Sequence, residues 1–159
     1  MTTQRVGRLG TRIENGKLVL EGRFDEGITG LEMLSGRVAD DAVIDLDGVT
    51  FVNSVGMREW MRLVRALRER GTVTLERVAD VVMAAMNLIP EFRAAVRIVS
   101  FHAPYACPAC GAEATPLVDA VTNLSALRQM QVPAAPCPEC GAAMELAEFP
   151  ERYLTIFQP

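Results

Sequence analysis

The chain of 159 residues contains a single histidine, His102, and a single lysine, Lys17. Histidine is the side chain that most often serves as a general base, and most nucleophiles need such a base close by at neutral pH. The sequence also has no glycine-rich loop of the kind that holds phosphates. Because these elements are missing, we expect the protein not to be an enzyme.

Long apolar runs are missing too. No stretch reaches the ~18 apolar residues that suggest a membrane-spanning helix. The first ten residues, MTTQRVGRLG, contain no apolar segment of the secretory type. We therefore expect a cytoplasmic protein without membrane contact. Cytoplasmic thiols stay reduced, which favours metal or redox chemistry over disulfides for any cysteines.

The overall composition is that of a globular protein. Hydrophobic residues make up 50% of the chain and charged residues 23%, which is enough apolar material for a packed core. The formal net charge of −4 disfavours binding to nucleic acid through a generally basic surface. The length suits one domain of about 100 residues with a small appendage.

The four cysteines form two C-x-x-C pairs, with C-P-A-C-G at 107–111 and C-P-E-C-G at 137–141. Four thiolates are a ligand set that structural zinc prefers, and they leave no open position for water. A glycine after each pair permits the left-handed turn of a zinc knuckle. We predict one structural Zn²⁺ held by Cys107, Cys110, Cys137 and Cys140. Two redox motifs or two disulfides are the alternatives.

The spacer between the two pairs has 26 residues, which is longer than the ~15–20 common in zinc ribbons. It must hold extra structure, and we predict a strand at 116–121 and a helical turn at 124–130. His102 precedes the first pair closely, but four cysteines make it superfluous as a ligand, so we expect an ordinary histidine at a strand end.

Before the cysteines, strands alternate with helices. Asn15-Gly16 predicts a hairpin between strands at 6–14 and 17–24. We expect a short helix or irregular crossover at 25–39, buried strands at 42–46, 72–75 and 95–101, and a helix at 81–88 capped by Asp80. A loop at 47–56 leads into the clearest helix, in which Met57, Trp60 and Met61 begin an apolar stripe that ends before Gly71.

Residues 43–67, VIDLDGVTFVNSVGMREWMRLVRAL, resemble the STAS family, named for sulfate transporters and anti-sigma-factor antagonists. The family pattern is a buried strand, a short loop and Asp-Ser-x-Gly opening an amphipathic helix. Asn53-Ser54-Val55-Gly56 matches this pattern with asparagine in place of aspartate. The resemblance implies an α/β fold, with a STAS-like mixed sheet and helices at 1–103, followed by a Cys₄ zinc ribbon at 104–159.

The resemblance also implies a function in signal transduction. In antagonist-type members, a partner kinase that is also an anti-sigma factor phosphorylates the loop serine, and a phosphatase resets the switch. Carried over, the target is Ser54, and the surface that binds the partner consists of Asn53, Ser54, Val55, Gly56, Arg58, Glu59 and Arg62. A simple helix cap is the alternative interpretation of Ser54.

Two other functions remain open. A STAS domain that no longer switches would act as a scaffold or homodimer, docked into an assembly through its zinc ribbon, and Asn53 favours this version. Nucleic-acid binding would use the ribbon or the row Arg58, Arg62, Arg65 and Arg68. Glu59 and Glu69 interrupt that row, which makes a solvated surface the better interpretation.

Overall fold

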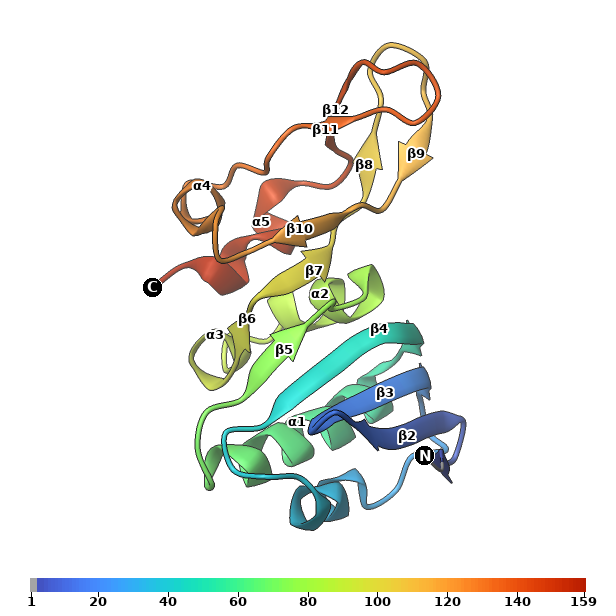
Figure 1. Cartoon of the computed structure of the whole chain (residues 1–159), viewed down its shortest axis with the longest axis vertical. Coiled ribbons are helices and arrows are strands. Elements are labelled where there is room, and N and C mark those ends of the chain that lie inside the picture. The colour runs from blue at the N-terminus through green and yellow to red at the C-terminus, as the bar shows by residue number, and fades with distance from the viewer. Residues whose placement is uncertain (1–2) are drawn as a thin grey trace.

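The computed structural model describes residues 3–159, and its centre is a mixed sheet with the spatial order β1-β2-β3-β4-β5-β6 (Figure 1). The first three strands are antiparallel, whereas β3, β4, β5 and β6 run parallel to one another. The strand bounds are β1 Gln4–Val6, β2 Leu9–Glu14, β3 Lys17–Phe24, β4 Val43–Val52, β5 Thr74–Glu76 and β6 Arg97–Ile98. The predicted α/β class with a mixed sheet is confirmed.

The N-terminal strands turn twice. Asn15 and Gly16 both have positive φ, 51° and 79°, and the pairing of Glu14 with Lys17 closes the predicted two-residue hairpin. The strand predicted at 6–14 begins at Leu9 instead, because the chain reverses at Gly7, with φ 63°, and the separate strand β1 pairs with β2. Gly7, the second residue of the predicted segment, provides the left-handed turn.

Helices cover one face of the sheet, and α1 lies behind β3 and β4 in Figure 1. Met57, Trp60, Met61, Val64 and Leu67 are all buried, so the predicted apolar stripe forms core. The first helix begins three residues earlier than predicted, and Asp80 is the first residue of its helix rather than the cap. The helical elements of this part are the 3₁₀ helix η1 Leu31–Arg37, α1 Ser54–Arg68, α2 Asp80–Asn87 and α3 Phe92–Ala95.

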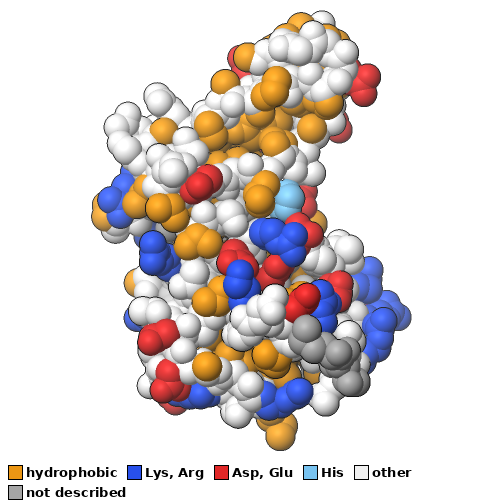
Figure 2. Space-filling model, in the orientation of Figure 1, with side chains coloured by type: hydrophobic (Ala, Val, Ile, Leu, Met, Phe, Trp, Pro, Cys, Tyr) orange, Lys and Arg blue, Asp and Glu red, His pale blue; other side chains and the backbone are white. Residues whose placement is uncertain are grey.

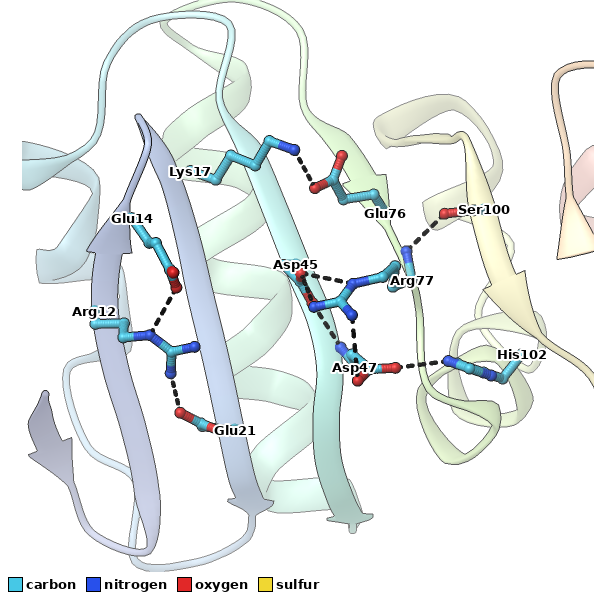
Figure 3. Close-up of polar contacts among 10 residues, drawn as sticks. All are labelled: Arg12, Glu14, Lys17, Glu21, Asp45, Asp47, Glu76, Arg77, Ser100 and His102. Atoms are coloured by element: carbon cyan, nitrogen blue, oxygen red, sulfur yellow. Dashed lines mark hydrogen bonds and ion pairs between the residues drawn. The ribbon is translucent and has the colours of Figure 1, made fainter. Parts of the chain in front are cut away.

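Strand β4 is longer than predicted. The segment Asp47–Val52 continues the strand and does not form a loop. Asp47 lies beside Asp45 and Arg77 on the sheet face that no described helix covers (Figure 3), and the exposed Thr50 donates from Oγ1 to the Gly22 carbonyl at 3.2 Å. Side chains of a strand point alternately to its two faces, so a strand with one exposed face can contain polar residues between buried ones. The polar residues of Asp47–Val52 are therefore compatible with a strand.

The C-terminal part extends the sheet before it forms the cysteine knuckles. Strand β7 pairs antiparallel with β10, and Val78 bridges to Phe101, so β10 covers the edge that β7 would otherwise expose. A small sheet with the order β11-β12-β8-β9 carries the knuckles (Figure 1). The bounds are β7 Ser100–His102, β8 Tyr105–Ala106, β9 Glu113–Ala114, β10 Leu117–Asp119, α4 Leu124–Arg128, β11 Ala135–Pro136, β12 Ala143–Leu146, α5 Pro150–Tyr153 and η2 Thr155–Phe157.

The chain then returns to pack on α2. Tyr153 donates its hydroxyl proton to the Asp80 carbonyl at 2.8 Å, and the Ile156 amide donates to Asn87 Oδ1 at 2.9 Å. The rings of Phe101 and Phe157 are 5.2 Å apart. Residues on both sides of the predicted boundary at 103/104 thus belong to one hydrophobic core. Among residues 3–159, no helix is both long enough and apolar enough to cross a membrane.

Candidate metal centre and partner-binding groove

The four cysteine sulfurs converge at the tip of the small sheet. Sγ of Cys107 is 3.6 Å from that of Cys140, Sγ of Cys110 is 3.6 Å from that of Cys137, and all four sulfurs lie within 4.8 Å of one another. Tetrahedral zinc with Zn–S bonds of about 2.3 Å requires sulfur separations of about 3.8 Å. A disulfide requires about 2.05 Å, and all four cysteines are free. The geometry therefore fits one metal ion coordinated by four thiolates.

The two knuckles have the same backbone geometry. In the first, the Gly111 amide donates to the Cys107 carbonyl at 2.9 Å, and the Cys107 amide donates to the Ala112 carbonyl at 2.8 Å. In the second, the corresponding distances are 2.9 Å from Gly141 to Cys137 and 2.7 Å from Cys137 to Ala142. Gly111 and Gly141 both have φ of 78°, a conformation that favours glycine.

A backbone amide lowers the pKa of every one of the four cysteines, and hydrogen bonds among the thiols then make the first cysteine of each pair the more acidic one. The Cys110 amide, followed by that of Ala109, lowers the pKa of Cys107 despite its burial. The Cys140 amide and then that of Glu139 lower the pKa of Cys137 to about 7. The Ala112 amide also lowers the pKa of Cys110, but hydrogen bonding to Cys137 and burial outweigh it and raise that pKa to about 12. Amides directed at the sulfurs stabilise thiolates, the form that binds metal.

His102 does not take part in this cluster. It ends β7, where its Nε2 lies 2.6 Å from Asp47 Oδ1 on β4 and its Nδ1 lies 3.0 Å from the Thr115 carbonyl (Figure 3). The predicted position at a strand end is confirmed, and the side chain joins the sheet to the segment that follows the first knuckle.

The open face of the sheet is a mosaic of ion pairs (Figures 2 and 3). Arg77 donates to Asp45 Oδ2 through Nε at 2.9 Å and through Nη2 at 2.6 Å, and the pKa of Arg77 is raised chiefly by this contact. Lys17 pairs with Glu76 at 2.6 Å. These cations have carboxylate partners, so this face offers little unpaired charge to a ligand.

The Ser54 loop lies on the other side of the sheet, where Asn53 caps α1. The Asn53 side chain accepts a hydrogen bond from the Gly56 amide at 3.0 Å, and its carbonyl accepts one from the Met57 amide at 2.9 Å. Ser54 is the first helical residue and is exposed, and within residues 3–159 its hydroxyl has no hydrogen-bond partner. The interpretation of Ser54 as the cap is therefore wrong, because Asn53 has that role.

A carboxylate that the sequence motif does not contain lies beside this loop. Asn53 Nδ2 donates to Glu26 Oε2 at 2.8 Å. The pKa of Glu26 is lowered by its own backbone amide and then by the Asn53 side chain. Glu26 precedes Asn53 by 27 residues and comes from the loop after β3. No local pattern around Glu26 indicates this contact.

Gly56 holds the loop against the end of β3. A Cβ atom at Gly56 would overlap the carbonyl group of Phe24 and crowd the Asp25 amide. The Asn53 amide donates to the same Phe24 carbonyl at 3.0 Å. The glycine thus permits direct backbone contact, which fixes the start of α1 and presents Ser54 and Val55 to solvent.

A groove of about 580 Å³ begins at Ser54 and runs between α1 and the α2–α3 region. Its apolar lining includes Met57 and Met61 from α1, and Leu88, which is 79% exposed, stands on the opposite side. Of the predicted surface, the groove contains Asn53, Ser54, Arg58 and Arg62, whereas Val55 and Gly56 adjoin it in sequence. The complete lining is Val52, Asn53, Ser54, Met57, Arg58, Met61, Arg62, Arg65, Ala85, Leu88, Ile89 and Glu91.

The partner-binding surface predicted from the sequence wrongly includes Glu59. Its side chain is buried, one of its oxygens has no hydrogen-bond partner, and it does not line the groove. Its position, three residues after the buried Gly56 and four before the buried Leu63, places it on the inner side of α1. A charged residue type alone did not predict exposure here.

Comparison of the chain with protein-family models, with curated proteins and with solved structures finds no match.

Proposed function

We propose that this protein is a non-enzymatic regulatory module that binds a protein partner over the Ser54 loop and is switched by phosphorylation of Ser54. The observation that carries the proposal is the position of an exposed serine at the mouth of a groove lined by apolar and basic side chains. The resemblance of Asn53-Ser54-Val55-Gly56 to the STAS loop suggests the kind of partner, an anti-sigma-factor serine kinase, with a phosphatase as the enzyme that resets the switch.

The local structure suits such a modification. The Ser54 hydroxyl is free, and the first turn of α1 contains no acidic residue. A phosphate adds about −1.5 to −2 charges, which the positive end of a helix tolerates. Arg58 lies one turn further along α1 on the groove side and would pair with the phosphate. The fold would survive phosphorylation, whereas a partner over the groove would meet new charge.

The cysteine cluster has a structural role in this proposal. One Zn²⁺ held by the four thiolates has no open coordination site, and the metal would stabilise a small sheet that has little apolar core of its own. We place the protein in the cytoplasm, where a kinase and a phosphatase have access to it.

Affinity capture from the source cells tests the switch. The baits are zinc-loaded wild type and the variants Ser54→Asp and Ser54→Ala. A partner retained by wild type and Ser54→Ala but lost with Ser54→Asp supports the proposal. Incubation of the captured kinase with ATP should add one phosphate mass to wild type and none to Ser54→Ala. An equal mass gain in both proteins would refute the site.

A scaffold or homodimer that does not switch is the second candidate. Asn53 favours it, since the family pattern has a carboxylate at this position. Such a protein would retain the same partners, or the same dimer, with Ser54→Asp as with wild type.

A further inference from the structure

The groove beside Ser54 has a basic border on its α1 side. Arg58, Arg62 and Arg65 follow one another at spacings of four and three residues and therefore form one stripe along the helix. All three are exposed. The chain as a whole has a net charge of −4, so this stripe is a local reversal of sign.

Part of this positive charge has no close counter-charge. Arg65 is paired with Glu91, the only acidic residue of the lining, through bonds of 3.1 and 2.7 Å. Arg62 has a single contact of 3.4 Å with the buried Glu59. Arg58 forms no ion pair in the part of the chain that the structure describes. This differs from the open face of the sheet, where Lys17 pairs with Glu76 and Arg77 pairs with Asp45, each at 2.6 Å.

The apolar part of the groove suits a helix. Met57 and Met61 form the apolar floor of the groove, where each side chain exposes 5% of its surface. Leu88 exposes 79% of its surface and would become buried under a docked segment. Helical elements line both sides, so an added β-strand would find no backbone edge to pair with.

The length of the groove sets the size of the occupant. The lining on α1 extends from Ser54 to Arg65, and at a rise of about 1.5 Å per residue this corresponds to about 16 Å, or three helical turns. An amphipathic helix of that length presents apolar side chains at i, i+3, i+4 and i+7 and has room for two or three carboxylates beside them.

We propose that the groove binds an acidic amphipathic helix of the partner, with its apolar side against Met57, Met61 and Leu88 and its carboxylates facing Arg58 and Arg62. This inference rests on the proposed function and names the chemistry of the partner. It also explains how a phosphate at Ser54 would act, because the phosphate would occupy Arg58 and repel the carboxylates at the groove mouth.

Two synthetic peptides of about 14 residues test the charge selectivity. Both carry fluorescein and leucines at i, i+3, i+4 and i+7, and the remaining positions are mostly glutamate in one peptide and mostly lysine in the other. Fluorescence anisotropy with the full-length, zinc-loaded protein should show binding of the acidic peptide, weaker at higher salt, and much weaker binding of the basic one. Equal affinities for the two peptides, or no binding of the acidic one, would overturn the proposal.

Variants then locate the site. Arg58→Glu combined with Arg62→Glu should weaken binding of the acidic peptide about tenfold or more, and Leu88→Asp should weaken it independently. Arg5→Glu, an exposed change on β1, is the matched control and should leave the affinity unchanged. Circular dichroism and zinc content establish that each variant is folded. A folded double variant with wild-type affinity would place the peptide elsewhere and overturn the proposal.

Two further measurements separate the alternatives. A single-stranded oligonucleotide that competes with the acidic peptide and loses affinity in the double arginine variant would overturn the helix as occupant in favour of nucleic acid. If the acidic peptide does not bind while cellular capture still depends on Ser54, only the inferred occupant is wrong. If capture is also indifferent to Ser54→Asp, the proposed function fails as well.

Discussion

His102 Nε2 on β7 lies 2.6 Å from Asp47 Oδ1 on β4, while the other ring nitrogen of His102 contacts the Thr115 carbonyl at 3.0 Å (Figure 3). Three segments far apart in the sequence meet at this one side chain. Figure 2 shows the histidine at the junction between the charged sheet face and the C-terminal part. The junction is thus held by specific polar contacts as well as by the pairing of β7 with β10.

We expect His102→Ala to lower the free energy of unfolding by about 1 kcal/mol, because two partly exposed polar contacts are lost. Chemical denaturation provides the measurement. Hydrogen exchange should also accelerate around Thr115 more than in β2, since the lost contact anchors the former segment. Arg93→Ala, an exposed change on α3, is the control. If exchange in His102→Ala accelerated no more around Thr115 than in β2, the side chain would not hold the junction.

Metal analysis of the purified protein should give about one zinc per chain, and Cys107→Ser should lose the metal, because three remaining thiolates bind zinc far more weakly. Thiol titration should show four protected cysteines before chelation and four reactive ones after it. We expect far-UV circular dichroism to change only modestly on chelation, since the C-terminal elements pack on α2 independently of the knuckles. A fully folded, metal-free protein as isolated would contradict the metal centre.

Gly56→Ala should destabilise the protein by about 2 kcal/mol, because the new Cβ would press on the backbone of Phe24. Urea denaturation measures the change. Gly36→Ala is the matched control. Gly36 lies in the short helix η1, and a Cβ atom at this position would meet no atom within 4 Å. If the two substitutions had equal effects, direct contact at Gly56 would not explain the glycine of the loop motif.

Acid should weaken the fold through Asp25. The Gly27 amide and then the Arg23 side chain lower its pKa below the ordinary value of 3.8, against the effect of burial. The native state therefore binds fewer protons than the unfolded state between these two pKa values, and stability rises with pH there. The contribution of Asp25 to the free energy of unfolding is complete at pH values above its ordinary pKa of 3.8, and it is lost as the pH falls toward the lower pKa of the folded state. In Asp25→Asn, the free energy of unfolding should depend less steeply on pH below 4; an unchanged slope would remove Asp25 as a cause.

Local patterns in the sequence predicted those features that local forces produce. Asn15-Gly16 predicted a hairpin because both residues tolerate positive φ, and the spacing of Met57, Trp60 and Met61 predicted the buried side of α1. The end of β4 was missed because Asp47 makes the segment polar, although the Asp47 side chain faces the open side of the sheet. Side-chain polarity cannot distinguish a loop from a half-exposed strand.

Contacts between distant segments left no signal in a single sequence. Tyr153 reaches Asp80 from the end of the chain, and Glu26 reaches Asn53 across a strand and a crossover. Each contact depends on the path of the backbone between the two residues. The cysteines are the exception, because four ligands of one metal predict their own proximity.

The pair of Glu26 and Asn53 yields the last prediction. Asn53→Asp keeps an oxygen that accepts from the Gly56 amide, so the cap of α1 survives. The amide that donates to Glu26 is replaced by a second carboxylate oxygen, at a position where the native contact measures 2.8 Å. We expect this like-charge contact to lower stability at neutral pH and to raise the pKa of Glu26, which the Asn53 side chain now helps to lower.

A double-mutant cycle isolates this effect. Glu26→Gln should be nearly neutral alone but should restore stability in the Asn53→Asp background, because it removes one of the two charges. Urea denaturation of the four proteins measures the coupling, which should shrink at high salt and near pH 3, where carboxylates are protonated. Additive effects would mean that Glu26 and residue 53 do not interact in solution. Strong coupling would establish that Glu26 and residue 53 interact directly and that two adjacent carboxylates at these positions destabilise the fold.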